Sequence, residues 1–121
     1  MEIRFEFRSG EVINGVSVYA NQVYVGDLIN IAQDNLMNWC CIQSRGDIKF
    51  ALRNEETFGC VLNAIKSYIH DNGYGGFVIS SYPGGIVSYY SEDFWNKHGF
   101  WQRENVPSSL YFFDKEKIFS K

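Results

Sequence analysis

The segment 55–71 constrains the fold of this chain more than any other feature. Its apolar side chains recur at the 3.6-residue period of an α-helix, and polar side chains occupy the opposite face. Asn54 can cap the first turn, and Asn72-Gly73 can end the helix at a left-handed residue. We therefore expect a long helix that buries one face. That face comprises Phe58, Val61, Leu62, Ile65, Tyr68 and Ile69.

Two strand-like segments flank this helix. Residues 47–52 alternate apolar and other side chains, with Ile48, Phe50 and Leu52 on one face. Residues 76–81 form an apolar run of the kind found in strands buried inside parallel sheets. Parallel strands need a crossover connection, and a helix usually supplies it. The sequence therefore predicts a central β-α-β unit made of 47–52, 55–71 and 76–81.

The remaining segments indicate a mixed α/β (α+β) fold with about three helices and seven or eight strands. Residues 2–8 alternate strictly, so Ile3, Phe5 and Phe7 share one face and charged residues share the other. With 121 residues, no internal repeat and no linker, residues 1–121 are expected to form a single domain. The other expected elements are strands 12–19, 22–28, 39–44, 100–104 and 109–114 and helices 29–38 and 88–98.

Composition excludes several classes of function. The net charge is −3 and no run of Lys or Arg occurs, so nucleic-acid binding is not expected. No apolar stretch reaches the length of a membrane span, and the charged first residues do not resemble a signal peptide. Cys40, Cys41 and Cys60 lack metal-ligand spacing, and only His70 and His98 could complement them. We expect reduced thiols, no metal site and a cytoplasmic location.

Aromatic residues are abundant, with 10 Phe, 8 Tyr and 3 Trp. Large rings bury much area each, so a core built from them is the simpler expectation. Part of the surplus could instead form a surface that binds a protein partner. An exposed cluster drawn from Tyr82, Tyr89, Tyr90, Trp95 and Trp101 would favour that alternative.

The stretch 47–114 resembles the second half of the GNAT family of N-acetyltransferases. That half consists of a strand, a pyrophosphate loop, an amphipathic helix, a strand, a helix and a closing pair of strands. The strongest local match is Asp93-Phe94-Trp95-Asn96-Lys97-His98-Gly99-Phe100, where the family has aromatic-Tyr-x-Lys-x-Gly-Phe. Residues 1–46 diverge from the family, which usually has two helices after its first strand. Since this half shapes the acceptor pocket, the resemblance does not identify the acceptor.

The resemblance implies a binding site for acetyl-CoA between two splayed central strands. In the family the pyrophosphate rests on backbone N–H groups at the start of the long helix, in a loop written Gln/Arg-x-x-Gly-x-Gly/Ala. Here Asn54, Thr57 and Gly59 take the three defined positions, and Glu55 and Glu56 lie between them, where they should repel a dianion. The alternative is an ordinary capped helix whose Gly59 permits close packing. The cofactor-binding residues implied are Asn54, Thr57, Gly59, Cys60, Val78, Ile79 and Ser80.

The catalytic positions also depart from the family, which commonly places a Tyr in its last helix to protonate the leaving thiolate. Trp95 takes that position here, and an indole N–H cannot act as the acid. Tyr90, about one turn earlier, could substitute, although its i, i+4 spacing to Phe94 also suits a core position. Asp47 is the candidate general base, and Asp27 lies on an earlier strand, although both could be turn residues.

Two functions follow from the resemblance. The first is an acetyl-CoA-dependent N-acyltransferase-like protein with a degenerate site, acting on an amine of a protein or small molecule. The second is a catalytically inactive GNAT-like binding module, for example a phage or mobile-element protein that inhibits a host protein; it could have lost acetyl-CoA binding. An unrelated α+β fold is a third alternative. The sequence does not decide whether the chain is an enzyme.

Overall fold

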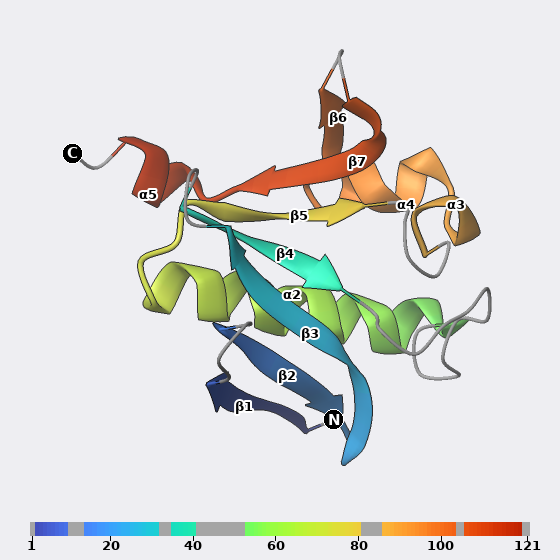
Figure 1. Cartoon of the computed structure of the whole chain (residues 1–121). Coiled ribbons are helices and arrows are strands. Elements are labelled where there is room, and N and C mark those ends of the chain that lie inside the picture. Colours follow the sequence, from blue (N-terminus) through green and yellow to red (C-terminus); the bar gives the residue numbers. More distant parts are fainter. Residues whose placement is uncertain are drawn as a thin grey trace.

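A computed structural model of the chain describes residues 2–9, 14–31, 35–40, 53–80, 86–103 and 106–119. Its strands form one seven-stranded sheet in the order β1-β2-β3-β4-β5-β7-β6 (Figure 1). The only parallel neighbours among these described strands are β4 and β5. The expected mixed sheet is therefore confirmed. The strands are β1 (Ile3–Ser9), β2 (Asn14–Ala20), β3 (Val23–Ile31), β4 (Leu36–Cys40), β5 (Gly76–Ser80), β6 (Trp101–Arg103) and β7 (Val106–Phe113).

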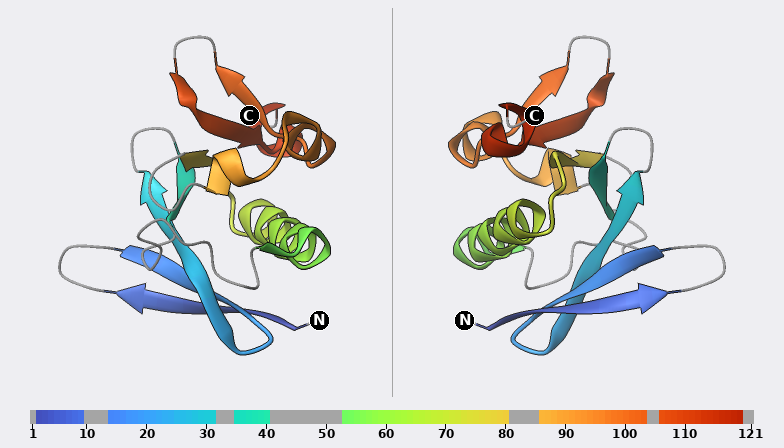
Figure 2. Two further views of the ribbon diagram at one scale, coloured as in Figure 1. Left: turned by 90° about the vertical axis from the view of Figure 1, so that its right-hand side faces the viewer. Right: turned by 90° about the vertical axis from the view of Figure 1, so that its left-hand side faces the viewer.

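The helices α2 and α4 cover the same side of the sheet (Figure 2). The expected helix 88–98 is wrong as a single element, because the structure has two short helices, α3 and α4, in its place. Tyr90 and Ser91 separate them, and the Ser91 Oγ accepts a hydrogen bond from the N–H of Phe94 at 3.3 Å, which caps α4. The helix α5, after β7, was not predicted. The helices are α2 (Glu55–Asp71), α3 (Ile86–Tyr89), α4 (Glu92–Lys97) and α5 (Lys115–Phe119).

The β-α-β unit exists, but its first strand is β4 and not 47–52. One edge of β5 pairs in parallel with β4, from Leu36–Gly76 to Trp39–Ile79. The other edge of β5 pairs with β7, so no edge of β5 is left for residues 47–52, which lie outside the described residues. Alternation alone cannot identify the neighbour of a strand, because pairing depends on segments distant in sequence.

The expected helix 29–38 is also wrong. Strand β3 continues to Ile31, β4 begins at Leu36, and Asn35 between them has a positive φ of 53°. Three apolar residues at helical spacing were too few to outweigh pairing with strands on both sides. The strands predicted at 2–8, 12–19 and 22–28 are confirmed as β1, β2 and β3. Asn21 and Gln22 connect the last two with φ values of 49° and 70°, as a two-residue hairpin turn requires.

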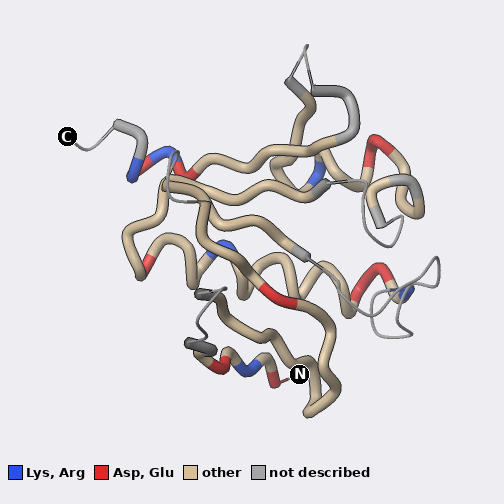
Figure 3. Tube along the Cα trace, viewed as in Figure 1, with Lys and Arg blue, Asp and Glu red and all other residues tan. Residues whose placement is uncertain are grey.

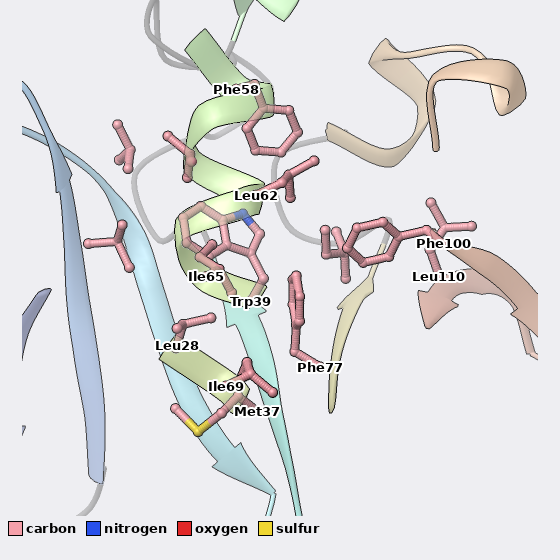
Figure 4. Close-up of a cluster of buried hydrophobic side chains, with 14 of the residues drawn as sticks. Leu28, Met37, Trp39, Phe58, Leu62, Ile65, Ile69, Phe77, Phe100 and Leu110 are labelled. Carbon is pink, nitrogen blue, oxygen red and sulfur yellow. The ribbon is translucent and has the colours of Figure 1, made fainter. Parts of the chain in front are cut away.

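The core lies between the sheet and α2 (Figure 4). The predicted apolar face of α2 is confirmed, since all its members are fully buried except Tyr68, which is half-buried and stacks on Phe5 of β1. Strands β2, β3, β4 and β5 contribute apolar side chains to the other side of this layer. A cluster of rings extends the core toward α4, which accounts for much of the aromatic surplus. Its members are Phe58, Tyr90, Phe94, Trp95 and Phe100.

Candidate functional site

The candidate site lies where β4 and β5 end. Their carboxyl ends, the start of α2 and the helices α3 and α4 are gathered on one side of the molecule, at the right of Figure 1. This arrangement follows from the crossover. The chain leaves the carboxyl end of β4, and α2 must carry it back to the end where β4 begins before β5 can run parallel to β4. Ligands of open α/β sheets bind outside the carboxyl ends of the parallel strands. The candidate site therefore comprises residues at this end of the sheet.

The start of α2 is capped by its own chain. The Asn54 side chain accepts a hydrogen bond from the Thr57 N–H at 3.0 Å, as the sequence predicts for an N-cap. Glu55 and Glu56 follow as exposed residues of the first turn. An anion at this helix end would therefore compete with Asn54 for one N–H group and approach two carboxylates.

A hollow of about 400 Å³ lies beside this end of α2, between it and α4. A Cβ atom added to Gly59 would lie 3.2 Å from Cε1 of His98, so glycine at this position lets the two helices approach. This contact agrees with the alternative that Gly59 permits close packing. Cys60, the next residue, is a free and exposed cysteine. The hollow is lined by Glu55, Glu56, Gly59, Cys60, Asn63, Lys97 and His98.

His98 is the residue of this hollow that sequence reasoning missed. Burial, with added repulsion from Lys66 and Lys97, lowers the pKa of His98 and favours its neutral ring. Lys66, whose own pKa is lowered by burial, donates a hydrogen bond to the carbonyl of His98. His98 is the C-cap of α4, and its neutral ring places no positive charge at that end of the helix dipole. The only sequence signal for this contact was the glycine at position 59.

The parallel pairing of β4 and β5 ends at Trp39 and Ile79. Ile79 is fully buried in the core. Val78 is buried on the other face of the sheet, where it is paired with Asn38 in the register of β4 and β5. Strand β5 ends at Ser80. Within the part of the chain that the structure describes, the Trp39 Nε1 and Asn38 Oδ1 atoms are buried without a hydrogen-bond partner. An unmade hydrogen bond of this kind costs about 1–3 kcal/mol. A polar ligand at the end of β4 could therefore gain by supplying one.

Tyr90, the candidate acid, packs in the aromatic cluster. Its ring centroid lies 4.1 Å from that of Phe94 and 5.4 Å from that of Phe58. Burial, then the nearby Tyr89 and Glu55, raises the pKa of Tyr90 to about 12. The phenol is therefore protonated at neutral pH. The i, i+4 spacing of Tyr90 and Phe94 does reflect core packing.

Trp95 and Tyr89 occupy contrasting positions. Trp95 is only 2% exposed, and its Nε1 donates to the Val87 carbonyl at 3.0 Å, so this N–H is committed to holding α3 against α4. Tyr89 is 49% exposed. Trp95 thus cannot contribute to an exposed aromatic surface.

The candidate carboxylates differ in what the structure describes. Asp47 lies outside the described residues. Asp27 is not a turn residue, because it lies within β3 and is buried. Its carboxylate accepts hydrogen bonds from Ser17 Oγ at 2.8 Å and from Tyr24 Oη at 2.7 Å. Asp27 is paired with Cys40 in the register of β3 and β4, which places it one strand away from the end of β4.

Within the described ranges, no three His, Cys, Asp or Glu side chains are grouped so that they could hold a metal ion. None of the described helices is both long and apolar enough to cross a lipid bilayer. Comparison of the chain with protein-family models, with curated proteins and with solved structures finds no match.

Proposed function

We propose that this chain is a GNAT-like protein that binds acetyl-CoA at the carboxyl ends of β4 and β5 and has a degenerate catalytic site. The observation that carries the proposal is the parallel β4–β5 pair, joined by α2 within an otherwise antiparallel sheet. The order of a strand, the long helix α2, the strand β5, the short helices α3 and α4 and the pair β6 and β7 also supports the proposal, with β4 in the place that the resemblance gives to residues 47–52.

Two buried polar atoms support a ligand at this place. The parallel pairing ends at Trp39, and the Trp39 Nε1 and Asn38 Oδ1 atoms lack partners among the described residues. The pantetheine arm of acetyl-CoA carries amide groups that can both donate and accept hydrogen bonds. Because neighbouring residues of a strand point to opposite faces, an arm lying along the end of β4 would reach one of these two atoms and supply the hydrogen bond that it lacks.

The start of α2 predicts that binding is weak. Glu55 and Glu56 line the hollow in which the pyrophosphate would lie, and Lys97 is the only Lys or Arg among the described residues that line it. Since the cofactor phosphates are anionic, the two carboxylates oppose the favourable field of the helix end. Neutralising them should therefore improve affinity.

The proposed reaction is transfer of the acetyl group to an amine. The amine nitrogen attacks the thioester carbonyl, the carbon–sulfur bond breaks, and the leaving thiolate takes up a proton. Tyr90 is the proposed proton donor, and its pKa of about 12 keeps the proton in place at neutral pH but makes the phenol a weak acid. Asp47 is the proposed base that accepts the amine proton. We expect slow turnover, reduced further in Tyr90→Phe.

Isothermal titration with acetyl-CoA tests the binding proposal. We expect saturable heat for the wild type, tighter binding for Glu55→Gln/Glu56→Gln, and weaker binding for Gly59→Trp, which fills the hollow. Glu2→Gln/Asp71→Asn is the matched control, since it removes the same charge from two exposed positions elsewhere. Absence of heat with the wild type and with Glu55→Gln/Glu56→Gln would refute acetyl-CoA binding.

The alternative function, a binding module for a protein partner, is favoured by one observation. Trp101 on the edge strand β6 is 44% exposed, and its ring lies 5.3 Å from that of Phe113. Exposed tryptophans are frequent at the centres of protein interfaces. If acetyl-CoA gives no heat, and Trp101→Ala loses a partner that the wild type binds, the binding module replaces the transferase.

A further inference from the structure

Strand β1 forms an open edge of the sheet. It pairs with β2 along one side only, and no strand of the described part of the chain lies beyond it (Figure 1). Seven residues, Ile3–Ser9, make up this edge. Exposed edges of this length offer unpaired backbone groups to another strand, so natural proteins usually cover or interrupt them. Phe7, near the middle of this edge, is 71% exposed.

The hydrogen bonds of Glu2 show which backbone groups face outward. Its carbonyl accepts from the Asn21 N–H at 2.8 Å, and its N–H donates to the Asn21 side chain at 3.1 Å. The backbone groups of Glu2 therefore point toward β2. Because this direction alternates along a strand, the N–H and C=O groups of Ile3, Phe5 and Phe7 point to the open edge.

We infer that the β1 edge binds the β1 edge of a second copy of this chain, antiparallel, about a two-fold axis at Phe5. In this register Phe5 faces Phe5 of the second copy, and Ile3 faces the second copy's Phe7. All three outward-facing residues then pair with outward-facing residues, so each pair can exchange both backbone hydrogen bonds. A two-fold contact of this kind is isologous and closes at two copies.

The charges of β1 favour this register over the two registers in which the axis lies one residue away. Arg4 and Glu6 share the face opposite the core side chains, and they form an ion pair within the strand at 2.9 Å. Acidic and basic residues both lie along this strand (Figure 3). About the axis at Phe5, Arg4 of each copy faces Glu6 of the other, so the contact contains two ion pairs between copies. An axis at Arg4 or at Glu6 would instead oppose two identical charges, which destabilises an antiparallel pair.

The same register covers the exposed apolar ring. On the core face, Phe7 of one copy would lie opposite Ile3 of the other and diagonal to its Phe5, which packs on Tyr68 of α2. A two-fold axis perpendicular to the sheet keeps the α2 helices of both copies on the same face. The contact therefore extends each core layer while it pairs the edges.

Charge reversal tests both the contact and its register. Arg4→Glu places two pairs of glutamates across the interface, and Glu6→Arg places two pairs of arginines there. We expect each variant alone to self-associate roughly thirtyfold more weakly than the wild type, because two attractive pairs become repulsive. An equimolar mixture of the two should form a heterodimer, and Arg4→Glu/Glu6→Arg should regain self-association. Circular dichroism checks that each variant is folded.

The measurement is sedimentation equilibrium over a concentration series. We expect the mass of the wild type to rise from 14.0 kDa toward twice that value. Asp71→Arg, at an exposed position at the end of α2, makes the same charge change as Glu6→Arg and should associate like the wild type. A wild type that stays at the mass of one chain overturns the inference, as does equal association of the single variants and the wild type. A mixture without heterodimer overturns the register.

Discussion

Gly76→Ala should destabilise this protein more than an alanine at any neighbouring glycine. A Cβ atom at residue 76 would lie 2.1 Å from the carbonyl oxygen of Phe112 and 2.9 Å from Cα of Phe113. Carbon–oxygen contacts across a sheet are about 3.3 Å, so the strands would have to separate by about 1 Å. Strand β5 cannot move away from β7 without disturbing β4, which pairs with its other edge.

The expected loss combines two effects. Overpacking costs about 1–3 kcal/mol, and each hydrogen bond lost where the strands separate costs about 1 kcal/mol more. We expect the free energy of unfolding to fall by about 3–5 kcal/mol. At about 0.05–0.15 kcal/mol per residue, the whole chain is stable by roughly 6–18 kcal/mol. The substitution therefore removes a large share of the stability.

Two nearby glycines supply controls. Gly75→Ala should change stability little, because the nearest atom to its added Cβ is 3.6 Å away. Gly73→Ala should cost about 1–2 kcal/mol, because no atom crowds it but its φ is +81°. Urea denaturation followed by tryptophan fluorescence gives the free energy of unfolding of the three variants, provided that its dependence on urea concentration is the same in each. A loss in Gly76→Ala within about 1 kcal/mol of that in Gly75→Ala would refute the steric reasoning.

Three further predictions concern the stability of the folded chain. Phe58→Ala should lower the free energy of unfolding by about 3–5 kcal/mol, since it empties the centre of the aromatic cluster, and urea denaturation measures it. Asp27→Asn should lower it by about 1–3 kcal/mol, because only one amide oxygen remains to accept from Ser17 and Tyr24. The pKa of Tyr90 is about 12 in the folded chain and 10.0 in the unfolded chain, so the phenol loses its proton at a lower pH when the chain is unfolded. The free energy of unfolding should therefore fall between pH 10 and about pH 12. Tyr90→Phe should show a shallower decline in denaturation experiments over that interval, and an identical decline would contradict the raised pKa.

The candidate site could be predicted only in part. Asn54 does cap α2, and Gly59 and Cys60 do line one hollow, because helix positions follow directly from sequence. The approach of His98 to Gly59 could not be predicted, since it joins two helices far apart in the chain. The environment of Tyr90 likewise depends on the ring of Phe58 from another helix.

The sequence by itself determined the elements whose signal is local. The period of 55–71 and its Asn54 cap specified α2, and the strict alternation of 2–8 specified β1 and its two faces. Only the tertiary structure decided that β4, and not 47–52, lies parallel to β5. A strand gains its backbone hydrogen bonds from whichever neighbour the whole sheet presents, and that choice depends on every other pairing. Periodicity shows which way the side chains of a strand point, and it carries no information about the strand that lies alongside.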